Sequence, residues 1–144
     1  MKLIHCLLHL LFPPKCVLCG SLLEKDETDL CTDCRVNGPE CLGRRRKYSF
    51  LDSWLALWHY EDNVRRSLLR YKFHNKRHYA ACYGRLLAMK IAREREDEFD
   101  LITWVPISRL RRLRRGYDQV ELLAKAVAAE LGMESVPCLR KIRH

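Results

Sequence analysis

The stretch Cys16–Cys34, CVLCGSLLEKDETDLCTDC, holds four of the eight cysteines in this chain of 144 residues. They form two Cys-x2-Cys pairs, which are separated by eleven residues. This layout is typical of a four-thiolate zinc site, because each tight turn aims two sulfurs at one point. Gly20 follows the first pair and gives the backbone room to turn. We therefore predict structural zinc, whose binding supplies the folding free energy of a segment with few apolar residues. The predicted ligands are Cys16, Cys19, Cys31 and Cys34.

A redox dithiol and a set of unrelated free thiols remain alternatives to zinc. The other four cysteines show no comparable pairing, so a secreted disulfide scaffold is disfavoured. The apolar opening, Leu3 to Phe12, lacks the small-residue cleavage site of a signal peptide. It is also shorter than the roughly 20 residues that span a bilayer. We expect a cytoplasmic, reducing location and no transmembrane segment.

Composition changes along the chain indicate three regions. Residues 1–12 predict an apolar helix that covers the core or pairs with a partner. Residues 13–47 hold the paired cysteines and several turn-forming residues, and they end in the basic run Arg44–Lys47. Residues 48–144 have the apolar periodicity of strands and helices. The predicted organisation is an N-terminal helix, a zinc ribbon and the N-terminal half of a larger domain.

The third region predicts an α/β fold. Alternating apolar residues indicate a strand over 51–60, and apolar runs indicate two further strands. A helix with its cap at Asp118 and its stop at Gly132 separates the last two strands. Strand, helix and strand in this order predict a βαβ unit with parallel pairing. The other predicted elements are a helix capped by Asp62 or Asn63, a helix over 79–95, and strands over 99–105 and 135–142.

Basic residues are concentrated just before that last helix. The chain has a net charge of +9, and five of its arginines fall within residues 109–115. They follow a predicted strand that ends at Pro106, and α/β sheets bind anions beyond the carboxyl ends of their strands. Guanidinium groups match phosphate with two parallel hydrogen bonds, so we predict a phosphate or pyrophosphate site. A solvated loop, or a helix with its arginines outward, remains an alternative. The predicted ligands are Arg109, Arg111, Arg112, Arg114, Arg115 and Gly116.

Several segments resemble the ComF family. They are LFPPKCVLCG at 11–20, LCTDC at 30–34, VPISRLRRLRRGYDQVELLAKAVAAELG at 105–132 and CLRKIRH at 138–144. The resemblance implies a type I phosphoribosyltransferase-like domain, with a partial parallel sheet, behind the zinc ribbon. It also implies an association with natural competence and DNA uptake. In such enzymes the loop after the first core strand holds pyrophosphate, which corresponds here to Pro106–Gly116.

The resemblance also exposes missing chemistry. Type I phosphoribosyltransferases bind ribose 5-phosphate with an acidic pair followed by a Thr-Thr-Gly-like loop. The threonines Thr28, Thr32 and Thr103 do not fit that pattern. We therefore interpret the chain as C-terminally truncated and inactive by itself, with Mg²⁺ bound only if a complete active site forms. The alternatives are an adaptor that binds single-stranded DNA, through Arg44–Lys47 and the arginine segment, and an interaction module for competence proteins.

Overall fold

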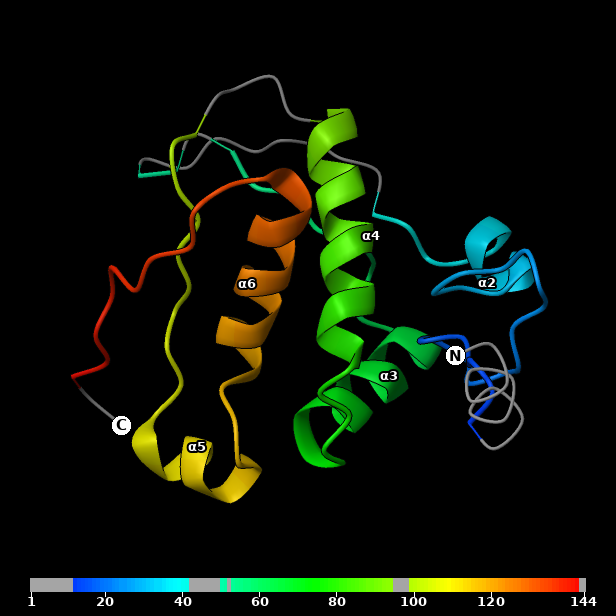
Figure 1. Ribbon diagram of the computed structural model, residues 1–144, viewed down its shortest axis with the longest axis horizontal. Helices are drawn as coiled ribbons and strands as arrows, with labels where there is room; N and C mark the ends of the chain where they lie inside the picture. The colour runs from blue at the N-terminus through cyan, green and yellow to red at the C-terminus, as the bar shows by residue number, and fades with distance from the viewer. Residues whose placement is uncertain (1–11, 42–49, 52, 95–98, 143–144) are drawn as a thin grey trace, which may run out of the picture.

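The computed structural model describes residues 12–41, 50–51, 53–94 and 99–142. Helices α4 and α6 pack side by side, and α3 crosses beside the lower part of α4 (Figure 1). The short helix α5 lies at the foot of α6, whereas the cysteine-rich segment and α2 lie on the opposite side of α4 (Figure 1). The helices are α2 (Thr32–Val36), α3 (Asp62–Phe73), α4 (Tyr79–Glu94), α5 (Arg109–Arg115) and α6 (Gln119–Leu131).

The predicted α/β fold, with its partial type I phosphoribosyltransferase-like parallel sheet, is wrong. The described parts of 51–60, 99–105 and 135–142 contain isolated bridges and no sheet. One bridge joins Ile102 to Ser135 in parallel, but the ladder does not continue along the two segments. Parallel strands are stable when both faces of their sheet are covered. Val105 is 71% exposed, so these two segments lack the covering layers that a parallel pair needs.

The predicted helices within the described residues are observed, because their start and stop signals are local, but the predicted cap at Asp62 or Asn63 is wrong, since the N-cap of α3 is Glu61. The helix expected over 79–95 is observed at Tyr79–Glu94. Asp118 caps α6 as predicted, since its Oδ1 accepts hydrogen bonds from the amides of Val120 at 3.0 Å and Glu121 at 3.2 Å. Gly132 ends α6 with φ at 65°, in the left-handed region that glycine favours. The helix predicted over 1–12 lies almost wholly outside the described residues.

A glycine sets the close approach of α4 and α6. A Cβ atom added at Gly84 would lie 2.5 Å from the Cβ of Ala126 and 3.0 Å from that residue's carbonyl carbon. No real side chain tolerates such contacts without movement of the backbone. Gly84 therefore lets the two helices pack backbone against backbone, and Ala124, Val127 and Ala128 bury the adjoining face of α6.

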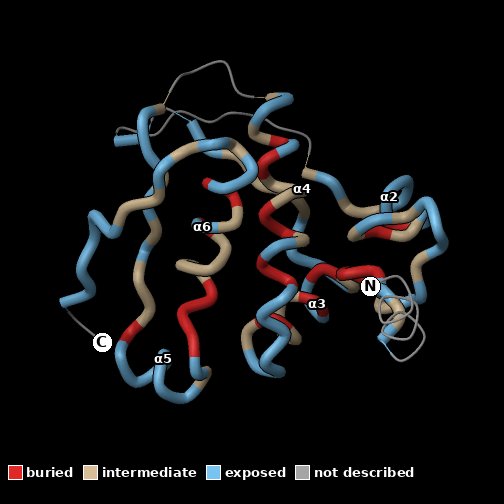
Figure 2. Tube along the Cα trace, viewed as in Figure 1, coloured by how far each residue is buried: buried red, intermediate tan, exposed pale blue. Residues whose placement is uncertain are grey.

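The cysteine-rich segment and the helices share one buried cluster. Val17 and Leu18 belong to the same cluster as Tyr71 and Tyr83. The buried hydroxyl of Ser67, on α3, donates to the carbonyl of Val17 and also bonds the hydroxyl of Tyr83. Buried stretches accordingly occur on α3, on α4 and on the segment before α2 (Figure 2). The ribbon thus packs onto the helices and shares their core.

Candidate metal centre and anion-binding pocket

The structure brings the four predicted cysteine ligands together. Their Sγ atoms all lie within 4.8 Å of one another, and those of Cys19 and Cys31 are 3.6 Å apart. A tetrahedral site with Zn–S bonds of about 2.3 Å has sulfurs roughly 3.8 Å apart, so the observed spacing fits. Cys16 and Cys34 are buried, whereas Cys19 and Cys31 are partly exposed. Four thiols at this spacing are the donor set of a closed, structural zinc site.

Two local structures aim these sulfurs. The first pair lies in a tight turn, in which Gly20 N donates to Cys16 O at 3.0 Å and Cys16 N donates to Ser21 O at 2.8 Å. Gly20 has φ at 86°, so a residue with a Cβ would be strained there. The second pair begins at the N-cap of α2, and its first turn brings Cys34 back toward Cys31. A turn and a helix start thus face each other across the metal position.

The thiols already differ in acidity before metal binds. Burial opposes ionisation of Cys19, but contacts with the Ser21 side chain and amide outweigh it and lower the pKa of this thiol to about 6. Burial and the neighbouring thiols raise the pKa of Cys34. A zinc ion binds the deprotonated forms, and four thiolates with Zn²⁺ carry a net charge of about −2. Arg70 Nη2 donates to the carbonyl of Leu18, between the first two cysteines, at 2.5 Å.

The arginine segment is helical, so the predicted loop from Pro106 to Gly116 is wrong in this part. Helix α5 starts after Ser108, whose side chain accepts a hydrogen bond from the amide of Arg111 at 3.4 Å. It ends at Gly116, where φ is 74°. None of its residues is buried. The five arginines therefore project in several directions from a short exposed helix.

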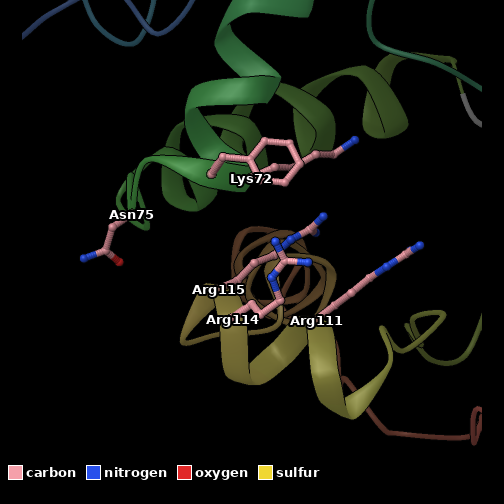
Figure 3. Close-up of a pocket in the computed structure, with 6 residues that line it drawn as sticks. Lys72, Asn75, Arg111, Arg114 and Arg115 are labelled. Carbon is pink, nitrogen blue, oxygen red and sulfur yellow. The ribbon is translucent and has the colours of Figure 1, made fainter.

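Three of these arginines line a hollow of about 560 Å³ between α5 and the end of α3. Figure 3 shows their side chains extending from α5 toward Lys72. The guanidinium carbon of Arg115 lies 4.8 Å from the ring centre of Phe73, which holds this side chain against the wall. No acidic residue lines the hollow within the described part of the chain. Its lining residues are Lys72, Phe73, Asn75, Arg111, Arg114 and Arg115.

The other predicted phosphate ligands lie elsewhere. The guanidinium of Arg112 pairs with the Glu121 carboxylate at 3.6 Å. Arg109 lines a second hollow on another side of α5. The carbonyl of Gly116 accepts a hydrogen bond from Arg77 at 3.2 Å. The structure thus divides the predicted arginine cluster into three environments.

Sequence reasoning missed Lys72 and Asn75 as parts of the hollow. The two residues lie at the end of α3 and are separated from α5 by more than thirty residues of sequence. Asn75 has φ at 53°, typical of an asparagine that ends a helical segment with a left-handed turn. A lysine or an asparagine near a helix end is too common in sequences to indicate an anion site. Only the folded structure shows that they line one hollow together with arginines of α5.

Comparisons with known proteins support the metal centre. Residues 7–43 match the family model of the double zinc ribbon domain. This match covers the cysteine-rich segment and leaves the helical part unassigned. No curated protein and no solved structure matches the chain significantly. The cysteine-rich segment is a zinc-binding ribbon, on the agreement between this match and the sulfur geometry.

Three further features of the sequence are the basic run, the absence of a predicted transmembrane segment, and Cys41. The basic run Arg44–Lys47 lies outside the described residues. Among the helices that are described, none is both long enough and apolar enough to cross a bilayer. Cys41 does not join the four ligands, and its carbonyl instead accepts a hydrogen bond from the ammonium group of Lys90 at 2.9 Å.

Proposed function

We propose that the chain is a zinc-stabilised protein that binds phosphate or pyrophosphate in the hollow between α3 and α5. The observation that supports this most strongly is the lining itself. Lys72, Arg111, Arg114 and Arg115 surround one space, and no carboxylate lines it among the described residues. Four cations that share a hollow repel one another unless an anion lies between them.

The chemistry of the lining fits condensed phosphate. Each guanidinium offers a fork of donors that matches two phosphate oxygens, and Lys72 adds a compact charge. Asn75 lies at the edge of the hollow with its amide directed away from the arginines (Figure 3), so the cations carry the proposed contacts. The stacking of Arg115 on Phe73 reduces the side-chain freedom that binding would otherwise remove.

The resemblance to the ComF family suggests where such binding is used. We propose that the chain takes part in natural competence, with a phosphate-bearing small molecule, single-stranded DNA or a competence protein as its partner. We propose binding without catalysis, since the chain lacks the acidic pair and threonine loop that hold ribose 5-phosphate in type I phosphoribosyltransferases. Zinc has a structural role in this proposal, because a closed four-thiolate site leaves no position for substrate.

Calorimetric titration of the zinc-loaded chain with inorganic pyrophosphate tests this proposal. We expect saturable binding that Arg115→Gln weakens by about tenfold or more, because a charge-assisted pair is lost. Arg65→Gln is the matched control, since Arg65 is an exposed cation on α3 that does not line the hollow. The absence of saturable binding, or equal effects of the two substitutions, would contradict the proposal.

Salt dependence separates a small phosphate ligand from single-stranded DNA. A DNA backbone that contacts several cations releases several counterions, so its affinity falls steeply as salt rises. We expect pyrophosphate to compete with a labelled oligonucleotide only if both occupy the α3–α5 hollow. Oligonucleotide binding that survives Arg115→Gln and excess pyrophosphate would place DNA on another surface.

A further inference from the structure

Helix α5 presents two leucines to solvent. Leu110 is 61% exposed and Leu113 is 80% exposed, and they lie three residues apart, which places them on one face of the helix. Arg111 and Arg115, four residues apart, share a different face and line the α3–α5 hollow. Arg114 also lines the hollow and follows Leu110 by four residues, so the leucine face adjoins the proposed phosphate pocket along this arginine. Exposed apolar residues grouped in this way are typical of an interaction surface.

The C-terminal segment adds to this surface. Figure 1 shows it descending alongside the extended segment that leads into α5, and Ile142 is 84% exposed. Between the segment and the start of α5 is a second hollow of about 390 Å³, to which three cations contribute. Its lining residues are Pro106, Ile107, Ser108, Arg109, Leu139, Arg140, Lys141 and Ile142. Apolar and cationic side chains thus both line this hollow.

We propose that this end of the molecule docks on the surface of a bilayer that contains anionic phospholipid. Leu110, Leu113 and Ile142 enter the interface between headgroups and acyl chains. The phosphate of a lipid headgroup occupies the hollow beside Arg109, Arg140 and Lys141. Basic amphipathic surfaces of this kind bind membranes through apolar burial together with attraction to the negative leaflet.

Two other occupants fit these observations less well. A second copy of the chain carries the same net charge of +9 and presents the same cations, so the two surfaces repel. A nucleic acid satisfies the cations through its phosphates but leaves Leu110 and Leu113 in water. An anionic bilayer covers both kinds of side chain at once.

Co-sedimentation of the zinc-loaded chain with vesicles tests the proposal. We expect binding to vesicles that contain phosphatidylglycerol and little binding to pure phosphatidylcholine. Arg140→Gln with Lys141→Gln should weaken binding by about thirtyfold, given roughly a tenfold change for each 1.4 kcal/mol and about 1 kcal/mol for each basic residue near the surface. Equal binding to the two kinds of vesicle would overturn the proposal.

A second pair of variants tests the apolar contribution. Leu110→Ser with Leu113→Ser should weaken vesicle binding about tenfold or more, because interfacial burial of the leucines is lost. Leu22→Ser with Val36→Ser removes two exposed apolar side chains from the ribbon and should leave vesicle binding unchanged. If both pairs of substitutions weaken vesicle binding equally, the proposed location of the docking surface is wrong.

The pyrophosphate site and the membrane-docking surface can be tested separately. Arg115→Gln should weaken pyrophosphate binding and leave vesicle binding nearly intact, whereas the leucine substitutions should do the reverse. Inorganic phosphate at millimolar concentration should not release the chain from vesicles, because it replaces only the headgroup contact. Complete release by phosphate would overturn docking and assign the second hollow to free phosphate.

Discussion

At the residue scale, Asp29 joins the ribbon to α4. Its carboxylate accepts two hydrogen bonds from the Arg85 guanidinium, at 2.8 Å and 2.5 Å. Its side chain is 9% exposed, whereas that of Arg85 is 43% exposed. Burial alone would raise the pKa of Asp29, but the hydrogen bonds from Arg85 outweigh it and lower the pKa below its ordinary value. The ion pair therefore holds the segment between the cysteine pairs against the helices.

Asp29→Asn should lower the free energy of unfolding by about 1–2 kcal/mol, because a half-buried ion pair lies between the buried and exposed limits. Asparagine also tolerates the left-handed φ of 63° at this position, so the change isolates the charge. Because the pKa of Asp29 is lower in the folded protein, its carboxylate adds to the free energy of unfolding. This stabilisation is complete above the pKa of the unfolded chain, about 3.9, and is lost as pH falls through the folded pKa. The difference between wild type and variant should therefore be constant from about pH 6 to about pH 8.

Urea unfolding of the zinc-loaded proteins measures this difference. Asp26→Asn removes the same charge from an exposed position in the same segment and serves as the control. A loss of stability no greater than that of the control would show that the Asp29–Arg85 pair does not hold the ribbon in place.

The cysteine ligands were predictable from the sequence because their spacing encodes a local geometry. A tight turn is specified within each Cys-x2-Cys pair, and the structure needs only to bring the two turns together. The hollow between α3 and α5, for which phosphate binding stays a prediction, was foreseeable only in part. Arg111, Arg114 and Arg115 are visible as a basic run, but Lys72 and Asn75 join them through tertiary packing that no local pattern records.

At the element scale, the contact of α4 with α6 depends on Gly84. At an exposed position inside a helix, a glycine-to-alanine substitution raises the free energy of unfolding by about 1 kcal/mol. Gly84→Ala should instead destabilise by about 1–3 kcal/mol, because the new methyl group meets Ala126 at 2.5 Å. Ala126→Gly in the same chain should recover part of that loss, and chemical unfolding of the two single variants and the double variant measures the coupling.

The sign of the change in the free energy of unfolding caused by Gly84→Ala decides this prediction. A more stable Gly84→Ala variant would mean that α4 and α6 lie farther apart than the structure places them. Additive effects of the two substitutions would mean that the residues do not meet.

Helices and strands differed in how far sequence could predict them. The helical elements carry local signals, and the cap at Asp118 and the stop at Gly132 were read correctly, whereas the cap at Ser108 and the stop at Gly116 that bound α5 were not. The predicted strands at 99–105 and 135–142 depended on partners elsewhere in the chain. Their apolar residues suggested burial, but Val105 and Ile142 lie mostly in solvent. An apolar run does not reveal whether neighbouring strands exist to cover it.

At the scale of the whole molecule, the zinc ribbon is part of the helical core. Val17 and Leu18 lie between the first two cysteine ligands and pack in the cluster that contains Tyr71 and Tyr83. The hydroxyl of Tyr71 donates to Gln119 O at 2.6 Å, which extends the network to the start of α6. We therefore expect loss of the metal to destabilise α3 and α6 as well as the ribbon, because these elements share buried contacts.

Thermal unfolding of the chain with and without zinc, followed by its helical circular dichroism, tests this central claim most directly. We expect one zinc ion for each chain and one cooperative transition in the loaded protein. Removal of zinc by a chelator should lower the midpoint of that same transition, and equimolar zinc should restore it, because metal binding is coupled to folding. Helices that melt at the same temperature with and without zinc would contradict the account.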